Sequence, residues 1–352
     1  MDYDQSNQFE RNVLRHDLNS EMEKKNILLV CHSGPSVGIG HLSRLLALAK
    51  YLKKSKKFKV EFLIFGDYFK SDELKAFKIN QLDIKSDFET SLNELMKKRI
   101  ASVIVFDLFT KLVPKNIEKV FASLKEKNIT LVGVDGLLNH STFLDILWIP
   151  SLIDKLKRPR NFRGEIVYGW NALLIQKRLT TKKWKPGSKV LVLTGGSDTT
   201  DLAKDLPRLI DELLRHDSII NWIQGPFSKR PVIPKKSRLS WNVHFAPSQL
   251  DKFINENDYV LTVFGISFFE VLQYGIPSVV FSPYGEKDKN DLRALSKEEV
   301  TSVANSSYNA VIKLKELMKN DHLSKKYSSN SLKKMSLSGS ENLTNKILSL
   351  KL

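Results

Sequence analysis

A histidine follows two closely spaced glycines at the point where an apolar segment gives way to an amphipathic one. Gly38 and Gly40 bracket Ile39, and His41 comes next. Glycines permit a tight turn and a close approach of the backbone to a ligand, and free N–H groups at a helix start attract anions. Because the helix dipole disfavours an imidazolium in the first turn, a neutral His41 could act as a general base near pH 7. The structural alternative is that His41 only caps the helix.

The residues at positions 43 and 44 limit which ligands this turn could bind. Arg44 lies one turn after His41, where it could contact a phosphate, orient His41, or form only a surface ion pair. A Gly-x-Gly pattern here also begins the dinucleotide fingerprint, which needs a third glycine or alanine at position 43. Because Ser43 occupies that position, the sequence argues against a nicotinamide cofactor, and we expect no cofactor.

A second small-residue segment, TGGSDTT at 194–200, follows the apolar run KVLVL. Small residues and hydroxyls before a helix can hold a diphosphate through backbone N–H groups. The segment lacks the Gly-Lys-Ser/Thr ending of a P-loop, which argues against triphosphate hydrolysis. A turn capped by Ser197 or Asp198 is the structural alternative, and it is compatible with phosphate contact. The candidate diphosphate contacts are Gly195, Gly196, Ser197 and Asp198.

A third segment, FGISFFEVLQYGIP at 264–277, again follows an apolar run. Gly265 and Ser267 are predicted at the start of a helix, with Glu270 in its first turn. A carboxylate facing the strand ends can accept both hydroxyls of a ribose. The alternative for Glu270 is an acid that is stabilised there by the helix dipole.

Polar residues also follow three other apolar runs. Asp107 ends VIVFD, Asp135 ends LVGVD, and Asn290 and Asp291 follow VVFSPYGEKDK. Such residues are candidates for a ligand site in an α/β cleft, although many only cap a loop. The remaining histidines show no metal-ligand spacing, and the single Cys31 excludes an intrachain disulfide and a cysteine-based zinc site. We therefore expect no metal site.

The elements that must position these residues form two alternating series of strands and helices. Strands separated by helices of this length indicate parallel sheets with right-handed crossovers. The first series comprises strands 26–31, 59–65, 102–106 and 130–134 with helices 41–52, 87–98 and 114–127. The second comprises strands 189–193, 219–223, 242–245, 259–263 and 278–281, a helix at 202–214, helices starting near 248 and 267, and a helical tail from 308.

The predicted fold class is α/β, with two doubly wound, Rossmann-like domains that face each other across a cleft. Ligands should bind at the carboxyl ends of the strands, between the domains. The expected boundaries are a polar N-terminal extension at 1–24, an N-terminal domain at 25–165, a connection at 166–187, a C-terminal domain at 188–330 and a helical polar tail at 331–352.

Composition limits the class of protein and its partners. The 352 residues include 56 Lys and Arg against 39 Asp and Glu, a formal net charge of +17, and 41% are hydrophobic. This length predicts about two globular domains. No apolar run is long enough to span a membrane, and the polar start does not resemble a secretory signal, so we expect a cytoplasmic protein. The charge favours anionic partners, but no nucleic-acid motif is present, and a solvated lysine-rich surface is the alternative.

Three segments taken together resemble a known family. GIGHLSR near the start, GGSD at the head of the second half and SFFEVLQYGIP further on follow the order of motifs in the UDP-2,4-diacetamido-2,4,6-trideoxy-β-L-altropyranose hydrolases of pseudaminic acid biosynthesis. That family is grouped with spore-coat polysaccharide proteins once predicted to be glycosyltransferases. The likeness extends from about residue 26 to residue 300.

The resemblance implies a GT-B architecture and a metal-independent attack by water on the anomeric carbon, with UDP as the leaving group. It implies that His41 activates the water, that 195–198 contact the diphosphate, and that Glu270 binds the uridine ribose. The N-terminal domain would then be the sugar and water side, where Asp107 and Asp135 fall near strand-end acids, and the C-terminal domain would be the UDP side.

We therefore expect an inverting UDP-sugar hydrolase of nonulosonate biosynthesis that acts as a monomer on a small-molecule UDP-sugar. A GT-B glycosyltransferase that uses a UDP-sugar donor for surface polysaccharide or lipid-linked glycan synthesis stays open as an alternative. The basic charge is compatible with a weak membrane-surface association, for which LFTKLVPK at 108–115 is a candidate patch. A non-catalytic nucleotide-sugar-binding protein is the third alternative.

Overall fold

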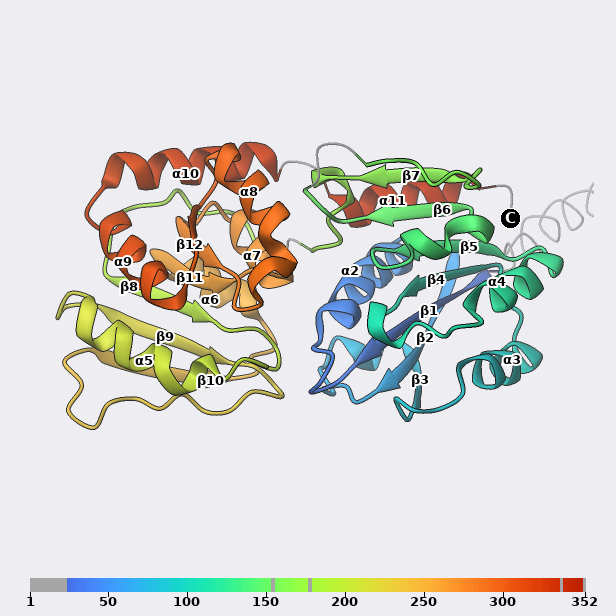
Figure 1. The fold of residues 1–352 in the computed structure, drawn as a ribbon, viewed down its shortest axis with the longest axis horizontal. Helices are drawn as coiled ribbons and strands as arrows, with labels where there is room; N and C mark the ends of the chain where they lie inside the picture. The colour runs from blue at the N-terminus through green and yellow to red at the C-terminus, as the bar shows by residue number, and fades with distance from the viewer. Residues whose placement is uncertain (1–23, 153–155, 177–178, 336–337, 351–352) are drawn as a thin grey trace, which may run out of the picture.

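The computed structural model describes residues 24–152, 156–176, 179–335 and 338–350. These residues form two α/β domains, each built on one parallel sheet (Figure 1). The predicted class of two doubly wound domains is confirmed. Residues 1–23 of the predicted N-terminal extension, 177–178 of the connection, and 336–337 and 351–352 of the tail lie outside the described residues.

The first sheet has the strand order β3-β2-β1-β4-β5-β6-β7. Its strands are β1 (Lys25–Ser33), β2 (Phe58–Gly66), β3 (Lys78–Leu82), β4 (Val103–Asp107), β5 (Thr130–Val134), β6 (Ile146–Ile149) and β7 (Glu165–Tyr168). The helices between them are α2 (Gly40–Lys54), η1 (Leu74–Ala76), α3 (Phe88–Lys98), η2 (Thr110–Leu112), α4 (Ile117–Glu126) and η3 (Leu138–Phe143).

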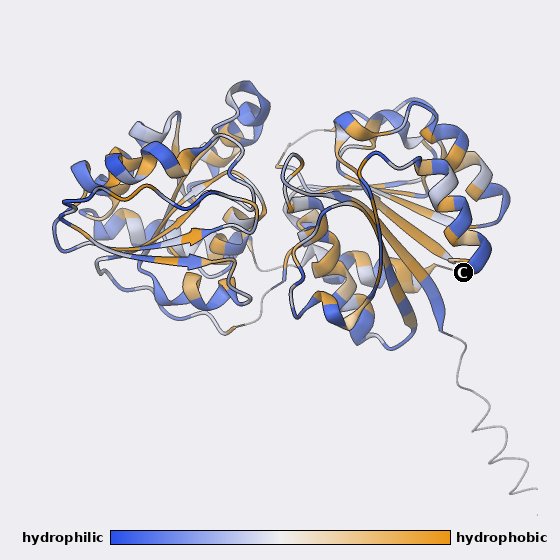
Figure 2. Cartoon of the chain, turned by 90° about the horizontal axis from the view of Figure 1, so that it is seen from below, coloured by the Kyte–Doolittle hydropathy of each residue, from blue (hydrophilic) through white to orange (hydrophobic). Residues whose placement is uncertain are grey.

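Strand β1 shows why these segments read as continuous apolar runs. Leu29 and Cys31 face the cluster that contains α2, whereas Leu28 and Val30 face the cluster that contains α3 and α4. A parallel sheet covered by helices on both faces must be apolar on both faces. Figure 2 shows the result as apolar strands between helices with polar outer surfaces.

The second sheet repeats the pattern with the order β10-β9-β8-β11-β12-β13. Its strands are β8 (Lys189–Leu193), β9 (Ile219–Gln224), β10 (Ser240–Phe245), β11 (Tyr259–Val263), β12 (Ser278–Phe281) and β13 (Ser302–Ala304). Its helices are α5 (Leu202–Leu213), α6 (Leu250–Glu256), α7 (Ile266–Leu272), η5 (Gly285–Asp288), α8 (Lys289–Glu298), α9 (Ser307–Leu317) and α10 (Asp321–Lys334).

Two segments extend the first domain beyond the predicted boundaries. Strand β7 continues the first sheet to Tyr168, past the predicted start of the connection at 166, and η4 (Trp170–Ala172) follows it. Helix α11 (Gly339–Ser349) lies in the predicted tail and returns to the first domain, where Leu343 and Ile347 pack into the same cluster as α2 (Figure 1). The apolar side of α11 explains this position, because burial of both side chains removes apolar surface from water.

In each sheet the chain order reverses beside the first strand. β1 lies between β2 and β4, and β8 lies between β9 and β11. Such switch points open a crevice at the carboxyl ends of the strands, where ligands bind in doubly wound folds. The segments that follow β1 and β8 therefore occupy the position with the best access to a ligand in each domain.

Candidate active site

The loop between β1 and α2 places His41 in the first turn of α2. Gly34 and Gly38 pair through two backbone hydrogen bonds, and the φ of Gly38 is +84°, a left-handed conformation that favours glycine. Ile39 precedes the helix and makes no side-chain cap. His41 does not cap α2 either, because its ring nitrogen Nδ1 contacts Asp107 instead.

His41 and Asp107 form a short side-chain pair at the switch point of the first sheet. The Nδ1 of His41 lies 2.7 Å from Oδ1 of Asp107, and the carboxylate is fully buried. Asp107 ends β4 opposite Cys31 of β1, which brings it beside the start of α2. Nη2 of Arg44, which can only donate, also lies 3.0 Å from Nδ1. Because the ionised carboxylate only accepts hydrogen bonds and lies closer, we assign the proton to Nδ1, which leaves Nε2 as the basic nitrogen. No hydrogen bond from Nε2 to another described residue is found.

Arg44 fixes this carboxylate from the other side. Its Nε and Nη2 donate to Oδ2 and Oδ1 of Asp107, each at 2.7 Å, and its Nη1 lies 3.0 Å from Oδ2 of Asp135. Such bidentate pairs are the most directional ion pairs in proteins. The Arg44 side chain is 10% exposed, so it is not a surface ion pair. Asp135 is more exposed and sits after β5 with φ of 58°.

The ion pairs determine the charge state of the cluster. Burial raises the pKa of Asp107, but Arg44 and His41 outweigh it and hold the pKa below its ordinary value. Burial lowers the pKa of Arg44, yet its two carboxylate partners leave the net pKa raised. The cluster therefore holds a permanent cation and a permanent anion against the ring of His41.

The glycine-rich loop after β8 meets the loop after β1. A Cβ added to Gly196 would lie 2.4 Å from Cγ1 of Ile39, and one added to Gly38 would lie 3.7 Å from Oγ of Ser197. Gly195 has φ of +93° and presents its carbonyl to Gly225, a residue that the sequence did not single out. The two domains are thus in direct contact through the loops at their switch points.

The side chain of Asp198 is directed at its own helix. Its two oxygens accept hydrogen bonds from the backbone N–H groups of Leu202, at 3.0 Å, and Ala203, at 2.8 Å. The capping alternative therefore describes this carboxylate. Burial raises the pKa of Asp198 despite both bonds. A phosphate at this loop would contact the backbone around 195–197 and the nearby hydroxyls rather than these two N–H groups.

The third segment differs from its sequence prediction. Helix α7 begins at Ile266, immediately after Gly265, with Ser267 in its first turn. Glu270 is therefore in the second turn, not the first, because the helix starts directly at the end of the short link from β11. A Cβ added to Gly40 would lie 3.9 Å from Cγ1 of Ile266, which puts the start of α7 beside the start of α2.

Asn290 is exposed on α8, and no hydrogen bond or ion pair joins it to the described residues of the cluster around His41. Its neighbour Asp291 instead reaches the first domain. Oδ1 of Asp291 accepts hydrogen bonds from Oγ of Ser151, at 3.0 Å, and from the N–H of Leu152, at 3.2 Å. Burial raises the pKa of Asp291, and the nearby charges of Asp288 and Asp135 raise it further. Sequence spacing gave no signal for this contact between domains.

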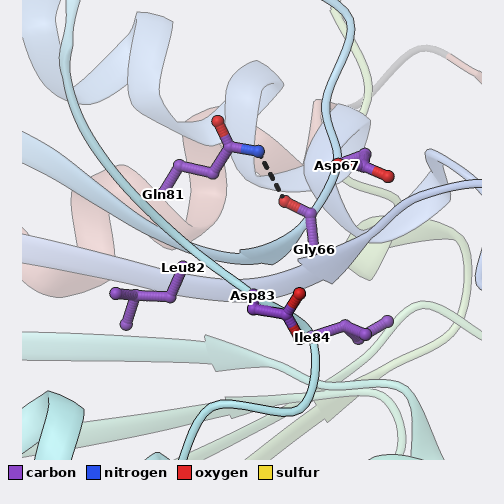
Figure 3. A pocket seen from close by; sticks show the side chains of 6 residues that line it. All are labelled: Gly66, Asp67, Gln81, Leu82, Asp83 and Ile84. Atoms are coloured by element: carbon purple, nitrogen blue, oxygen red, sulfur yellow. Dashed lines mark hydrogen bonds between the residues drawn. The ribbon is translucent and has the colours of Figure 1, made fainter.

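A separate depression lies at the carboxyl ends of β2 and β3. Its volume is about 290 Å³, and its lining is Gly66, Asp67, Gln81, Leu82, Asp83 and Ile84. The amide of Gln81 donates a hydrogen bond to the carbonyl of Gly66, a second residue of the lining (Figure 3). None of the residues singled out from the sequence lines it.

Among the residues that the structure describes, no group of three His, Cys, Asp or Glu side chains is arranged to hold a metal ion. Within the same residues, no helix has the length and apolar character needed to cross a bilayer.

Comparison with known proteins gives a distant relative and clear fold neighbours. No protein-family model matches the chain. An uncharacterised protein of Methanocaldococcus jannaschii is 28% identical over 284 residues, which are 72% of this chain and 55% of that protein. The chain therefore spans about half the length of that relative.

Solved structures match almost the whole chain. The MurG protein of Acinetobacter baumannii superposes with a TM-score of 0.58 at 15% identity, over 93% of this chain and 100% of that one. A putative UDP-N-acetylglucosamine 2-epimerase from Listeria monocytogenes gives 0.59 at 14% identity, over 93% and 96%. The glycosyltransferase VinC in complex with dTDP gives 0.62 at 9% identity, over 92% and 98%. The chain has the two-domain GT-B fold.

Proposed function

We propose that this chain is a nucleotide-sugar hydrolase that releases UDP from a UDP-diacetamido-trideoxy sugar in nonulosonate biosynthesis. The observation that carries the proposal is the 2.7 Å pair between Nδ1 of His41 and the buried Asp107. This pair sits where the two domains meet, in a fold whose ligands bind at the carboxyl ends of the strands. The sugar itself is proposed from the resemblance of the motifs around His41, Gly195 and Glu270.

The pair is suited to activate a nucleophile. Asp107 holds the proton on Nδ1, so Nε2 can take a proton from water as the water attacks the anomeric carbon. The carboxylate then stabilises the imidazolium that forms, because opposite charges attract strongly in a buried site. Arg44 keeps Asp107 ionised and in place. A positioned base of this kind contributes about 10²- to 10⁴-fold to the rate.

Negative charge develops on the diphosphate of the leaving group, and the rest of the site must stabilise it. We propose that the backbone around 195–197 and the hydroxyl of Ser197 contact the diphosphate, and that Glu270 contacts the ribose. Backbone N–H groups aimed at a developing phosphate charge stabilise the transition state without reorganisation. A single displacement by water inverts the anomeric centre. Two fold neighbours, a putative UDP-N-acetylglucosamine 2-epimerase and a glycosyltransferase in complex with dTDP, support a nucleotide-sugar ligand.

The test measures UDP release from a panel of UDP-amino sugars by the purified full-length chain, without acceptor and without added metal. His41→Ala should lower the release about 10²- to 10⁴-fold. His322→Ala is the matched control, because His322 is exposed on α10 in the second domain. Equal turnover by His41→Ala and the wild type would show that the base assignment is wrong.

A glycosyltransferase is the second candidate. The observation that favours it is that several fold neighbours are glycosyltransferases, VinC among them. The same nitrogen of His41 would then deprotonate an acceptor hydroxyl in place of water. UDP release that requires a lipid or glycan acceptor would support this candidate, whereas UDP binding without release in either condition would support a binding protein.

A further inference from the structure

His32 is a buried histidine that the proposed reaction does not use. It lies near the end of β1 and is 3% exposed. Its Nδ1 accepts a hydrogen bond from the backbone N–H of Phe109, at 3.1 Å, and its ring packs against Phe65 with 5.8 Å between centroids. The bond therefore ties the loop after β4 to the end of β1.

Phe109 connects this anchor to the proposed base. It follows Asp107 by two residues, and its ring meets the ring of His41 edge to face, with 6.0 Å between centroids and 68° between planes. Such contacts between aromatic rings have a preferred geometry. Asp107 contacts the ring of His41 at Nδ1, and Nη2 of Arg44 lies 3.0 Å from the same nitrogen. Both contacts act on one edge of the ring, and the edge contact with Phe109 adds a second restraint on its plane.

We infer that His32 is a positioning residue, which acts through Phe109 to fix the plane of the His41 ring and the direction of its Nε2. The inference rests on the proposed function for its kinetic readout only. The position of Nε2 matters because a displacement of about 1 Å at a reacting group can reduce a rate about 10²-fold.

The protonation state of His32 is consistent with this role. An acceptor nitrogen carries no proton, so His32 must be neutral with its proton on Nε2. Burial and the nearby charge of His41 lower the pKa of His32 to about 4, while Asp107 opposes that shift. The anchor to Phe109 is therefore retained at every pH above about 5.

The test compares two substitutions of equal size. His32→Asn places its Oδ1 where Nδ1 stood and can still accept from Phe109, whereas His32→Leu cannot accept a hydrogen bond. We expect His32→Leu to lower kcat about 10- to 100-fold with KM within about twofold, and His32→Asn to retain kcat within about threefold. Equal kcat for the Leu variant and the wild type would overturn the inference.

A second measurement does not need turnover. The ¹⁵N resonances of the His41 ring in the ligand-free protein, assigned with His41→Gln, report its tautomer and surroundings. They should move in His32→Leu and in Phe109→Ala but not in His32→Asn. Unchanged resonances in Phe109→Ala would overturn the inference even if His32→Leu fails to fold. If no donor is turned over while the resonances shift as expected, the proposed function fails and the positioning role stands.

Discussion

The loops after β1 and after β8 occupy the same place in their two domains and differ in how the following helix begins. Helix α2 starts without a side-chain cap and without an acid in its first turn. The start of α5 is closed by Asp198, whose carboxylate accepts from two of its N–H groups. The same topology therefore presents an open, positive helix start in one domain and a neutralised one in the other.

The acids of the two domains differ in the same way. Asp107 is paired with the guanidinium of Arg44, and its pKa is lowered. Asp198 and Asp291 accept from backbone and hydroxyl groups, and their pKa values are raised by burial. The first domain therefore holds its buried acid in a fixed charge pair beside His41, whereas the second uses buried carboxylates to hold its own loops and the contact between domains.

The largest expected effect is that of Asp107→Asn. An amide can donate to Nδ1 and so allow the wrong tautomer of His41, which should lower turnover at least as far as His41→Ala does. Removal of one partner from a buried ion pair also costs about 3 kcal/mol of unfolding free energy, at the lower end of the usual range because Arg44 retains Asp135. Steady-state kinetics measures the loss of turnover, and urea unfolding measures the loss of unfolding free energy. Asp135→Asn is the matched control, since Asp135 is 45% exposed and should cost less than about 1 kcal/mol.

The stabilisation from Asp107 also has a defined pH range. Its folded pKa lies below the ordinary value, so the folded state holds fewer protons than the unfolded state as pH falls. The contribution is complete above about pH 4 and is lost as pH decreases through the folded pKa. The unfolding free energies of the wild type and Asp107→Asn should therefore converge below pH 4. A constant difference down to pH 2 would contradict the ion-pair assignment.

The contact between the two loops gives the next effect. Gly196→Ala places a methyl group 2.4 Å from Ile39, so the loops must separate or the Ile39 side chain must move. Overpacking of this kind costs about 1–3 kcal/mol. If both loops contact one substrate, this cost corresponds to about a 5- to 150-fold rise in KM. Ile39→Ala in the same chain should restore KM. Gly40→Ala is the control, because its Cβ would make only ordinary contact with Ile266.

These differences show what the sequence could and could not predict. The apolar runs around Leu29 and Leu191 are long and buried on both faces, so β1 and β8 could be predicted. Strand β3 is polar and lies at a sheet edge, and β13 has three residues, so neither has the apolar periodicity of a strand. Strands β6 and β7 have only four residues each, which is too short for the sequence pattern to predict them.

The candidate site shows the same limit. Asp107 was singled out because it ends a strand, but its pairing with His41 depends on the register of β4 against β1. That register comes from tertiary packing, which local periodicity does not encode. The direction of Asp198 toward α5 and the contact of Asp291 with Ser151 likewise depend on the folded backbone. The return of α11 to the first domain had no local signal, because its apolar side chains only require some partner surface.

The cap of α5 gives a smaller effect on stability. Asp198→Ala should lower the unfolding free energy by about 1 kcal/mol, the usual cost of losing such a cap. Asp198→Asn should lower it less, because the amide oxygen still accepts from Leu202. Calorimetric affinity for UDP should change less than twofold in both variants, since the carboxylate faces the helix. A tenfold loss of UDP affinity in Asp198→Asn would show that the carboxylate of Asp198 itself contacts the ligand, as the sequence predicted.

Asp291→Asn should have the smallest effect. It tests whether the stability contribution of Asp291 depends on pH in the opposite direction to that of Asp107. Both hydrogen bonds end on Oδ1, so an amide oxygen can accept from Ser151 and Leu152 without a buried charge. The raised pKa of Asp291 means that its contribution is complete below about pH 4 and is lost as pH rises through the folded pKa, the reverse of Asp107. Near pH 7 the variant should be within about 0.5 kcal/mol of the wild type or slightly more stable, whereas Asp291→Ala should lose about 1–3 kcal/mol. Urea unfolding between pH 3 and pH 8 measures how the unfolding free energy of each variant changes with pH. If Asp291→Asn loses as much unfolding free energy near pH 7 as Asp291→Ala, the charge of Asp291, rather than its acceptor oxygen, holds the two domains together.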